Sequence, residues 1–322
     1  MMLLTSDYKP PFLLRNGHLQ SIYPSLFRKF DPALYKRERI STPDDDFLDL
    51  DWSEVNSDCL AVISHGMEGS SHRAYVIGMA RALNHQGWDA LAWNFRSCGG
   101  EMNRQLRMYH SGSTDDLDLV INHALLKNKY KKIALIGFSM GGNLTLVHLG
   151  QKGKNRDQRI RAAVVFSVPT DLHSSSMRLG EPQNILYMKR FLRMLHRKVR
   201  DKKLLFPDKI DDRDFHRIKN FKDFDDRYTA PIHGFKNAED YWHKCSSKLF
   251  LKDIAVPTLI VNAKNDPFLP PSCYPVEDVR DHPYIYLEIP KSGGHVGFVS
   301  FNSDNSYWSE KRTIGFLSTH VT

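Results

Sequence analysis

The sequence lacks paired cysteines and long apolar runs. No stretch of about 18 apolar residues could span a bilayer. The first residues, MMLLTSDYKPPF, lack the basic segment and the long apolar core of a signal peptide. The cysteines stand far apart with no CxxC pair, which argues against a zinc site and indicates thiols in a reducing compartment. They are Cys59, Cys98, Cys245 and Cys273. We therefore expect a cytoplasmic globular protein without internal repeats or low-complexity segments.

The balance of charge is basic, with 45 lysines and arginines against 37 aspartates and glutamates, a formal net charge of +8. Hydrophobic residues make up 41% and charged residues 25% of the chain, which is ordinary for a protein with a buried core. A solvated basic face accounts for this excess, and attraction to an acidic surface is the alternative. Because no nucleic-acid-binding motif accompanies the basic residues, we expect no nucleic-acid partner.

Short apolar runs alternate with segments of helical spacing from about residue 59 onward. Continuous apolar runs are typical of strands that are covered on both faces. The predicted strands are 59–66, 89–95, 132–138, 161–168, 257–263 and 284–289. The predicted helices between them are 74–88, 113–128 and 142–153. This order predicts an α/β fold with a mostly parallel, doubly wound sheet.

Two segments depart from this alternation. The region 170–250 is far longer than an ordinary connection between strands, and its pattern is mostly helical and rich in aromatics. We interpret it as a helical lid inserted before the penultimate strand. At the other end, residues 1–40 form an N-terminal arm, in which 8–30 would pack on the core through aromatic side chains. The whole chain, 1–322, then forms a single domain.

Residues 131–144, KKIALIGFSMGGNL, contain the sequence G-x-S-x-G around Ser139. A lone match of this kind is weak, but here it directly follows a predicted strand and precedes a predicted helix. That context suits a sharp turn in which the positions two before and two after the serine must be small, and both Gly137 and Gly141 meet this need. The helix N-terminus would also point free N–H groups at a developing oxyanion. We therefore predict Ser139 as an activated nucleophile.

A nucleophilic serine needs a histidine to take its proton and an acid to orient that histidine. Asp266 follows the predicted strand 257–263 and stands in a turn before a proline. Asp253 is the competing acid, but it precedes the same strand and would lie at the opposite end of the sheet. Position after a strand therefore favours Asp266 over an ordinary turn-forming aspartate.

The histidine is expected after the acid in the chain order Ser, Asp, His. Three histidines satisfy that order: His282, His295 and His320. His295 lies in a glycine-rich loop just beyond the last predicted strand, where it can reach the nucleophile. His282 precedes that strand and His320 stands near the chain end, so His295 is the predicted base.

An oxyanion hole needs a second backbone N–H besides that of Met140. The segment SHGMEGSSH (64–72) follows a predicted parallel strand, and the N–H of Met67 would face the pocket. His65 then serves as a hydrogen-bonded scaffold residue rather than as a second base.

These motifs resemble the α/β-hydrolase superfamily and, more narrowly, its YheT-like branch of hydrolases. The blocks that resemble this branch are PPFLLRNGHLQSIYPS (10–25), SHGMEGSSHRAY (64–75), WNFRSCGGEMNR (93–104), YHSGSTDDL (109–117), GFSMGGN (137–143), FDDRYTAPIHGF (224–235), NDPFLPP (265–271) and SGGHVGF (292–298). The resemblance implies the α/β-hydrolase fold, a triad of Ser139, Asp266 and His295, and no cofactor. Within FDDRYTAPIHGF we expect a structural role for Tyr228 and His233, although either could line the pocket.

The resemblance also implies a serine carboxylester hydrolase that acts on short- to medium-chain acyl esters through an acyl-serine intermediate. An acyltransferase that passes the acyl group to an alcohol is the first alternative. A non-catalytic lipid-binding protein is another, but it predicts a missing triad member and none is missing. A peptidase would share the same triad.

The lid contains a basic run, MKRFLRMLHRKVRDKK (188–203), in which apolar residues recur at helical spacing. We interpret it as an amphipathic helix that packs on its own domain and exposes a solvated basic face. The alternative partner is anionic lipid, held peripherally near the active-site mouth.

Overall fold

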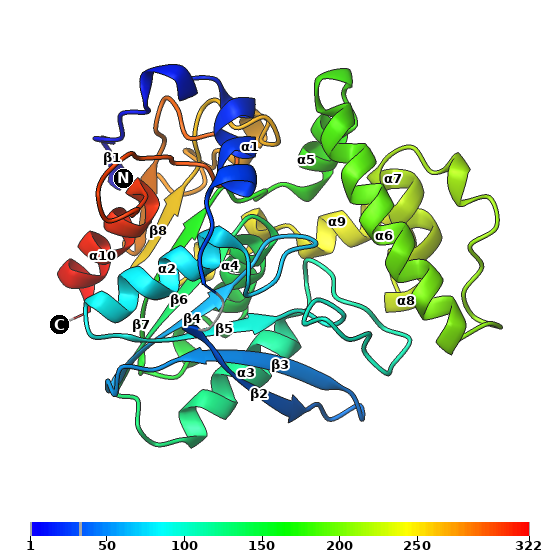
Figure 1. Ribbon diagram of the computed structural model, residues 1–322, viewed down its shortest axis with the longest axis horizontal. Coiled ribbons are helices and arrows are strands. Elements are labelled where there is room, and N and C mark those ends of the chain that lie inside the picture. The colour runs from blue at the N-terminus through cyan, green and yellow to red at the C-terminus, as the bar shows by residue number, and fades with distance from the viewer. Residues whose placement is uncertain (1, 32–33, 322) are drawn as a thin grey trace.

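The computed structural model describes residues 2–31 and 34–321 (Figure 1). Positions 1, 32–33 and 322 lie outside the described residues, and with them small parts of the predicted arm (1–40) and domain (1–322). Within the described chain one sheet has the strand order β1-β9-β8-β7-β6-β4-β5-β3-β2. Its strands are β1 (Met2–Leu4), β2 (Lys36–Ser41), β3 (Phe47–Ser53), β4 (Cys59–Ser64), β5 (Asp89–Asn94), β6 (Lys132–Phe138), β7 (Ile160–Phe166), β8 (Thr258–Val261) and β9 (Ile285–Glu288).

The sheet is parallel from β1 across to β5, and β3 and β2 complete it in antiparallel pairing. The prediction of a mostly parallel sheet is therefore confirmed, and each of the six predicted strands is present within a few residues. Strand β6 lies between β4 and β7 near the middle of the sheet. Loops that leave the carboxyl ends of these neighbouring parallel strands consequently meet at one edge.

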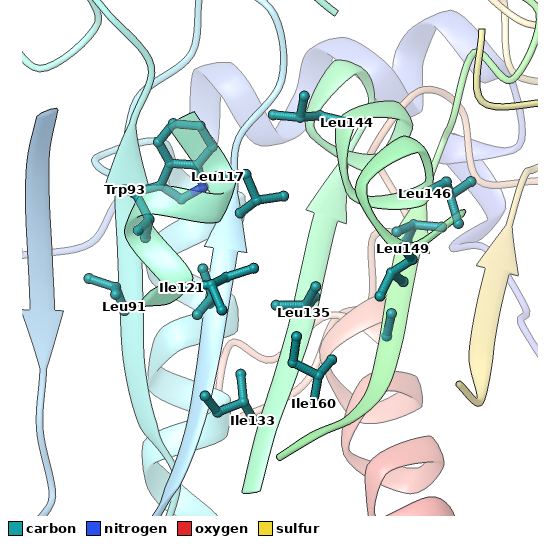
Figure 2. Close-up of a cluster of buried hydrophobic side chains, with 14 of the residues drawn as sticks. Leu91, Trp93, Leu117, Ile121, Ile133, Leu135, Leu144, Leu146, Leu149 and Ile160 are labelled. Carbon is teal, nitrogen blue, oxygen red and sulfur yellow. The ribbon is translucent and has the colours of Figure 1, made fainter. Parts of the chain in front are cut away.

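Helices cover both faces of the sheet, as the doubly wound interpretation requires. Alternate residues of the central strands face α3 (Thr114–Leu126) and α4 (Met140–Lys152) on one side. The residues between them face α2 (Ala74–His85) and α10 (Trp308–His320) on the other. Figure 2 shows the first of these layers, with side chains of β5, β6 and β7 packed beneath those of α3 and α4.

Three strands were missed by the sequence interpretation: β1, β2 and β3. Strand β3 alternates apolar and acidic residues, and yet all seven are buried. The acids are tolerated because β2 supplies cross-strand partners: Arg37 pairs with Asp51 at 2.8 Å and Arg39 with Asp49 at 2.7 Å. A strand that buries its charges in this way does not show the apolar run by which the other strands were recognised.

The chain between β7 and β8 is helical, in the region predicted as the lid (Figure 1). It packs around a hydrophobic cluster of its own that is rich in aromatic side chains. Its helices are α5 (Leu172–Leu179), α6 (Ile185–Leu205), α7 (Phe221–Phe224), α8 (Ala230–His233) and α9 (Ala238–Cys245). A π-helical turn, Asp225–Thr229, joins α7 to α8. The N-terminal arm contributes α1 (Gly17–Phe27), and its ends are edge strand β1 and strand β2.

The layer in Figure 2 gives a direct test of core packing. Leu135 on β6 is 1% exposed beneath α3 and α4, whereas Leu126 at the end of α3 is 78% exposed. We expect Leu135→Ala to lower the free energy of unfolding by about 3 kcal/mol, because it removes buried methyl groups and leaves a cavity. Leu126→Ala should change it by less than about 0.5 kcal/mol. Urea unfolding followed by circular dichroism measures both; equal values for the two variants would contradict the packing.

Candidate active site

Ser139 occupies a strained turn between β6 and α4. Its φ of 54° and ψ of −120° lie outside the regions that a non-glycine residue normally adopts. The turn is held from both sides, since the Ser139 N–H donates to the carbonyl oxygen of Phe166 at 2.8 Å and the Ser139 carbonyl accepts from the N–H of Asn143 at 3.0 Å. Backbone strain that the surrounding structure holds in place is typical of functional sites.

The glycines on either side of Ser139 are required by close backbone approach. A Cβ on Gly137 would lie 2.6 Å from the Gly141 carbonyl oxygen, and one on Gly141 would lie 2.4 Å from the carbonyl oxygens of Ser64 and His65. Because the obstructing atoms are backbone, they cannot move aside as a side chain could. The G-x-S-x-G spacing is therefore enforced by the packing of β6, α4 and the loop after β4.

The structure brings Ser139, His295 and Asp266 together. The His295 Nε2 atom lies 2.9 Å from the Ser139 Oγ atom, within hydrogen-bond distance. The His295 Nδ1 atom lies 2.9 and 3.1 Å from the two carboxylate oxygens of Asp266. Asp266 is 3% exposed, and its carboxylate also accepts the N–H of Phe268 at 2.9 Å. The order hydroxyl, imidazole, carboxylate is that of a nucleophile, its base and an orienting acid.

Helix α1 fixes the loop that carries His295. The N–H of His295 donates to the Ser21 hydroxyl at 2.7 Å, and the N–H of Gly294 donates to the Asn265 side chain at 3.0 Å. The contact is close: a Cβ on Gly294 would lie 2.5 Å from the carbonyl oxygen of Gly17. The arm is thus packed directly against the loop of the base, a role that the sequence interpretation did not assign to it.

The competing residues lie away from this site. Asp253 is exposed at the other end of β8, at the end of a 3-10 segment. His282 donates to the Lys252 carbonyl at 3.3 Å in the same region. His320 lies at the end of α10, and its ring packs on that of Tyr286 of β9 at a centroid distance of 4.7 Å.

His65 is fully buried beside the site, and both of its ring nitrogens are used by the backbone. Nδ1 donates to the Gly66 carbonyl at 2.7 Å, and Nε2 accepts from the Phe95 N–H at 3.2 Å. Burial lowers the pKa of this imidazole to about 3, so the ring is neutral at physiological pH. His65 accordingly has the geometry of the scaffold residue that we expected.

The loop after β4 lies against Ser139, because a Cβ on Gly66 would stand 3.2 Å from the Cβ of Ser139. The next residue is Met67, and Met140 follows Ser139 at the first turn of α4. In the part of the chain that the structure describes, neither of these two amide N–H groups donates a hydrogen bond. Two unused donors beside a serine hydroxyl suit a site that stabilises an oxyanion.

A cavity of about 550 Å³ opens at Ser139 and His295 and extends between α1 and the lid. Its lid side is mainly apolar and aromatic. The large apolar and aromatic side chains there are Leu172, Leu179, Tyr187, Phe191, Met194, Phe221, Tyr241 and Trp242, and Phe268 joins them from the loop after β8. A volume of this size is ordinary for a small-molecule site, and the lining suits an acyl chain.

Asp225, at the start of the π-helical turn, is a buried acid in this cavity wall. Its carboxylate accepts from the Trp242 Nε1–H at 2.8 Å and from the Thr229 hydroxyl at 2.5 Å. Burial raises the pKa of the carboxyl to about 7, with a smaller contribution from the negative charge of Asp226. A π-helical turn is a rare feature that often marks functional sites.

Side chains connect the lid to the core at several points. Lys198 of α6 lies 2.9 Å from the carboxylate of Glu68, which follows Met67 directly, and Tyr109 donates to the same carboxylate at 2.5 Å. Glu68 has a positive φ of 53°, so this pair holds a strained loop next to the candidate oxyanion site.

Tyr228 and His233, whose role the sequence left open, are not among the residues that line the cavity. The Tyr228 hydroxyl donates to the Asp211 carbonyl at 2.7 Å. His233 contacts the backbone of Thr229 at 2.7 Å and of Met108 at 2.9 Å, and so ties α8 to the core loop before α3. The structural role that we expected for both residues agrees with these contacts.

Within residues 2–31 and 34–321, no three side chains of the histidine, cysteine, aspartate or glutamate type are placed to hold a metal ion. The four cysteines are free thiols, and burial raises the pKa of Cys245 and of Cys273 to about 12.

The chain is similar to proteins of a known family. The family model described as the alpha/beta hydrolase fold matches residues 62–300, and the chain belongs to this family. Within it the chain belongs to the branch of YheT: it is 33% identical over 327 residues to the Escherichia coli (strain K12) protein named "Putative esterase YheT", covering 98% of this chain and 94% of that one. It is also 28% identical to the mouse protein named "Phospholipase ABHD3", covering 92% of this chain and 74% of the relative.

Among solved structures, the Pyrococcus furiosus esterase Pf2001 has the same fold. It superposes with a TM-score of 0.61 at 18% identity, covering 98% of this chain and all of that chain. The resemblance inferred from the motifs, and the α/β-hydrolase fold that it implied, are thereby confirmed.

The raised pKa of Asp225 predicts a pH-dependent stability. The folded-state pKa of about 7 lies above the ordinary value of 3.8, so the folded protein keeps a proton that the unfolded chain has lost. The free energy of unfolding should therefore fall as the pH rises from about 4 to about 7 and be level above that. The decline should reach at most roughly 4 kcal/mol.

Asp225→Asn should remove most of this decline, because an amide does not titrate. Asp226→Asn is the matched control. The pKa of the Asp226 carboxyl is lowered, so this substitution should leave most of the decline in place and remove only the small part that the Asp226 charge contributes. Urea unfolding at pH 5 and pH 8 measures the difference for each variant. If the free energy of unfolding changes equally with pH in wild-type protein and in Asp225→Asn, the raised pKa of Asp225 is contradicted.

Proposed function

We propose that this protein is a serine esterase that hydrolyses short- to medium-chain carboxylic esters through an acyl-serine intermediate. The observation that supports the proposal most strongly is the 2.9 Å distance between the Ser139 hydroxyl and the His295 Nε2 atom, with Asp266 on the far side of the ring. The names of the relatives point to the same chemistry, since YheT and Pf2001 are called esterases and ABHD3 a phospholipase.

In the proposed reaction the Ser139 Oγ atom attacks the acyl carbonyl carbon while His295 takes the hydroxyl proton. The N–H groups of Met67 and Met140 stabilise the resulting oxyanion. The tetrahedral intermediate collapses with cleavage of the ester C–O bond, and His295 gives its proton to the departing alcohol. A water molecule, deprotonated by His295, then attacks the acyl carbonyl carbon. The bond from this carbon to Ser139 Oγ breaks, His295 returns its proton to that oxygen, and the acid is released. Asp266 orients the imidazole and stabilises its positive charge throughout.

The first test is labelling of Ser139. A fluorophosphonate probe should label wild-type protein covalently, because the probe reacts only with an activated serine. Ser139→Ala should take up no probe and should lose hydrolysis of p-nitrophenyl butyrate by more than about three orders of magnitude.

Ser318→Ala, which changes an exposed serine of α10, is the matched control and should label like wild type. Equal labelling of Ser139→Ala and wild type would remove the basis of the proposal.

The apolar lid side of the cavity supports a preference for acyl chains of limited length. In a series of p-nitrophenyl esters from acetate to palmitate, kcat/KM should rise from acetate as more of the acyl chain is buried against this lining, and we expect its maximum between butyrate and decanoate. Chain lengths are compared below the micelle-forming concentration of each ester. A flat series or a maximum at palmitate would contradict the preference.

Acyl transfer to an alcohol is the alternative that the same acyl-enzyme permits. It is favoured to the extent that the cavity excludes water, and the aromatic lining of the lid supports such exclusion. With a medium-chain acyl thioester and an added alcohol, the ratio of ester to free acid separates the two activities. If the protein is a hydrolase, as we propose, the main product is the free acid.

We also propose that the basic run 188–203 makes a peripheral contact with anionic lipid. Five of its cationic side chains are exposed on α6 and form no ion pair with a described residue. They are Lys189, Arg190, Arg193, Arg197 and Arg200. Cations in this arrangement attract an anionic surface.

A further inference from the structure

Helix α1 exposes its apolar side chains and buries its polar or small ones. Four large apolar residues on it are exposed: Leu19, Ile22, Leu26 and Phe27. The buried positions of the same helix are Gly17, Gln20 and Pro24. A helix that only supported the core would bury its apolar face, so the outer face of α1 is built for something other than water.

The apolar surface continues beyond α1 on both sides. Before the helix, Phe12 and Leu13 are among the most exposed apolar residues of the described chain. The exposed Phe301 adjoins the helix through Tyr23, whose ring lies 5.8 Å from it. The start of α6 adjoins it as well, because His18 contacts the Tyr187 hydroxyl at 3.3 Å.

We call these residues the α1 surface. Its members are Phe12, Leu13, Leu19, Ile22, Leu26, Phe27, Ile185, Leu186 and Phe301. They make up nine of the seventeen large apolar side chains exposed in the described residues, and η1 (Phe12–Leu14), α1 and the start of α6 lie on one side of the molecule (Figure 1). Such a gathering is larger than the scattered exposure that needs no explanation.

Exposed cations alternate with the apolar residues along the segments that form the α1 surface. Residues 8–30 contain no aspartate or glutamate but include Lys9, Arg15 and Lys29. The unpaired cations of α6 begin at Lys189 and Arg190, within one turn of the apolar start of that helix. Acids stand near its ends as well: Asp7 and Asp31 flank this segment in the chain, and Glu181 precedes α6. An apolar patch with a basic rim suits an interface that offers both hydrocarbon and negative charge.

The α1 surface also adjoins the cavity that contains Ser139. Ser21, Ile22 and Ser25 of α1 line that cavity, as do Tyr187 and Arg190 of α6. A molecule that leaves a lipid layer at this point could reach the cavity without crossing bulk water. Docking of the α1 surface on a bilayer would therefore bring the cavity close to the lipid.

We propose that the α1 surface is a docking site for an anionic lipid bilayer, in which the exposed apolar side chains enter the interface and the surrounding cations meet the headgroups. A second copy of the chain suits this surface less well, because two copies joined through it would bring both basic rims together. The proposal goes beyond the basic run of α6, since its apolar anchors come from the arm. In the described residues no helix is both long and apolar enough to cross a membrane.

The test is sedimentation with vesicles of phosphatidylcholine alone and of phosphatidylcholine with about 30% phosphatidylglycerol. Wild-type protein should bind the anionic vesicles, and Leu26→Gln/Phe27→Gln should bind them at least about tenfold more weakly. Neither side chain lines the cavity, so hydrolysis of soluble p-nitrophenyl butyrate should be unchanged. Leu126→Gln changes a leucine of α3 that is even more exposed, at 78% against 58% for Leu26; it is the control and should bind like wild type.

Several results would overturn the proposal: no vesicle binding by wild type, equal binding to neutral and anionic vesicles, or normal binding by Leu26→Gln/Phe27→Gln. If only Arg193→Gln/Arg197→Gln loses binding, the lipid contacts the basic run of α6 and not the α1 surface. A wild-type dimer in gel filtration that the α1 variant abolishes would assign the surface to a second copy. Ser139→Ala should bind vesicles like wild type, so failure of the esterase proposal is visible separately.

Discussion

The backbone at Ser139 is the constraint on which the rest of the structure depends. A non-glycine residue with φ of 54° and ψ of −120° costs on the order of 1–3 kcal/mol and persists only where the surroundings leave no alternative. Here β6 ends between two parallel neighbours, α4 begins at once, and backbone atoms stand within contact distance of Gly137 and Gly141. The central position of β6 thus holds the half-buried hydroxyl of Ser139 within hydrogen-bond distance of His295.

The arm and the lid then hold the remaining groups from opposite sides. The arm packs on the loop of His295 through Ser21 and Gly17, so the imidazole is fixed by a segment more than 250 residues away in the chain. The lid reaches the loop of Met67 through the ion pair between Lys198 and Glu68. Neither segment supplies a member of the candidate triad, but both contact the loops on which His295 and the candidate oxyanion donor Met67 lie.

Much of this arrangement follows from sequence patterns with a direct physical cause. Buried parallel strands read as apolar runs, and a sharp turn that needs glycines two positions away shows as G-x-S-x-G. The choice of Asp266 over Asp253 as the candidate acid rests on the rule that functional residues follow the strands of a parallel sheet. Asp266 lies 2.9 Å from His295, whereas Asp253 precedes β8. The aromatic residues of the arm predict that it packs on the core. Its contact with the loop of His295 depends on small residues such as Gly17, which give no periodic signal in the sequence.

What could not be predicted depends on partners that are distant in sequence. Strand β3 reads as polar because Asp49 and Asp51 interrupt it, and only the arginines of β2 explain their burial. The π-helical turn and the raised pKa of Asp225 likewise require knowledge of Trp242 and Thr229. The exposure of Leu26 and Phe27 is another such case, because a helix with this composition would ordinarily turn its apolar residues inward.

The central claim, that Ser139 carries the acyl group, is tested most directly by trapping the intermediate. Wild-type protein is mixed with p-nitrophenyl butyrate, quenched in acid within milliseconds, digested and analysed by mass spectrometry. The account predicts that the peptide containing Ser139 gains one butyryl group, and that the modification builds up before steady-state turnover. Hydrolysis that proceeds with this peptide unmodified, or with the butyryl group on another residue, would contradict it.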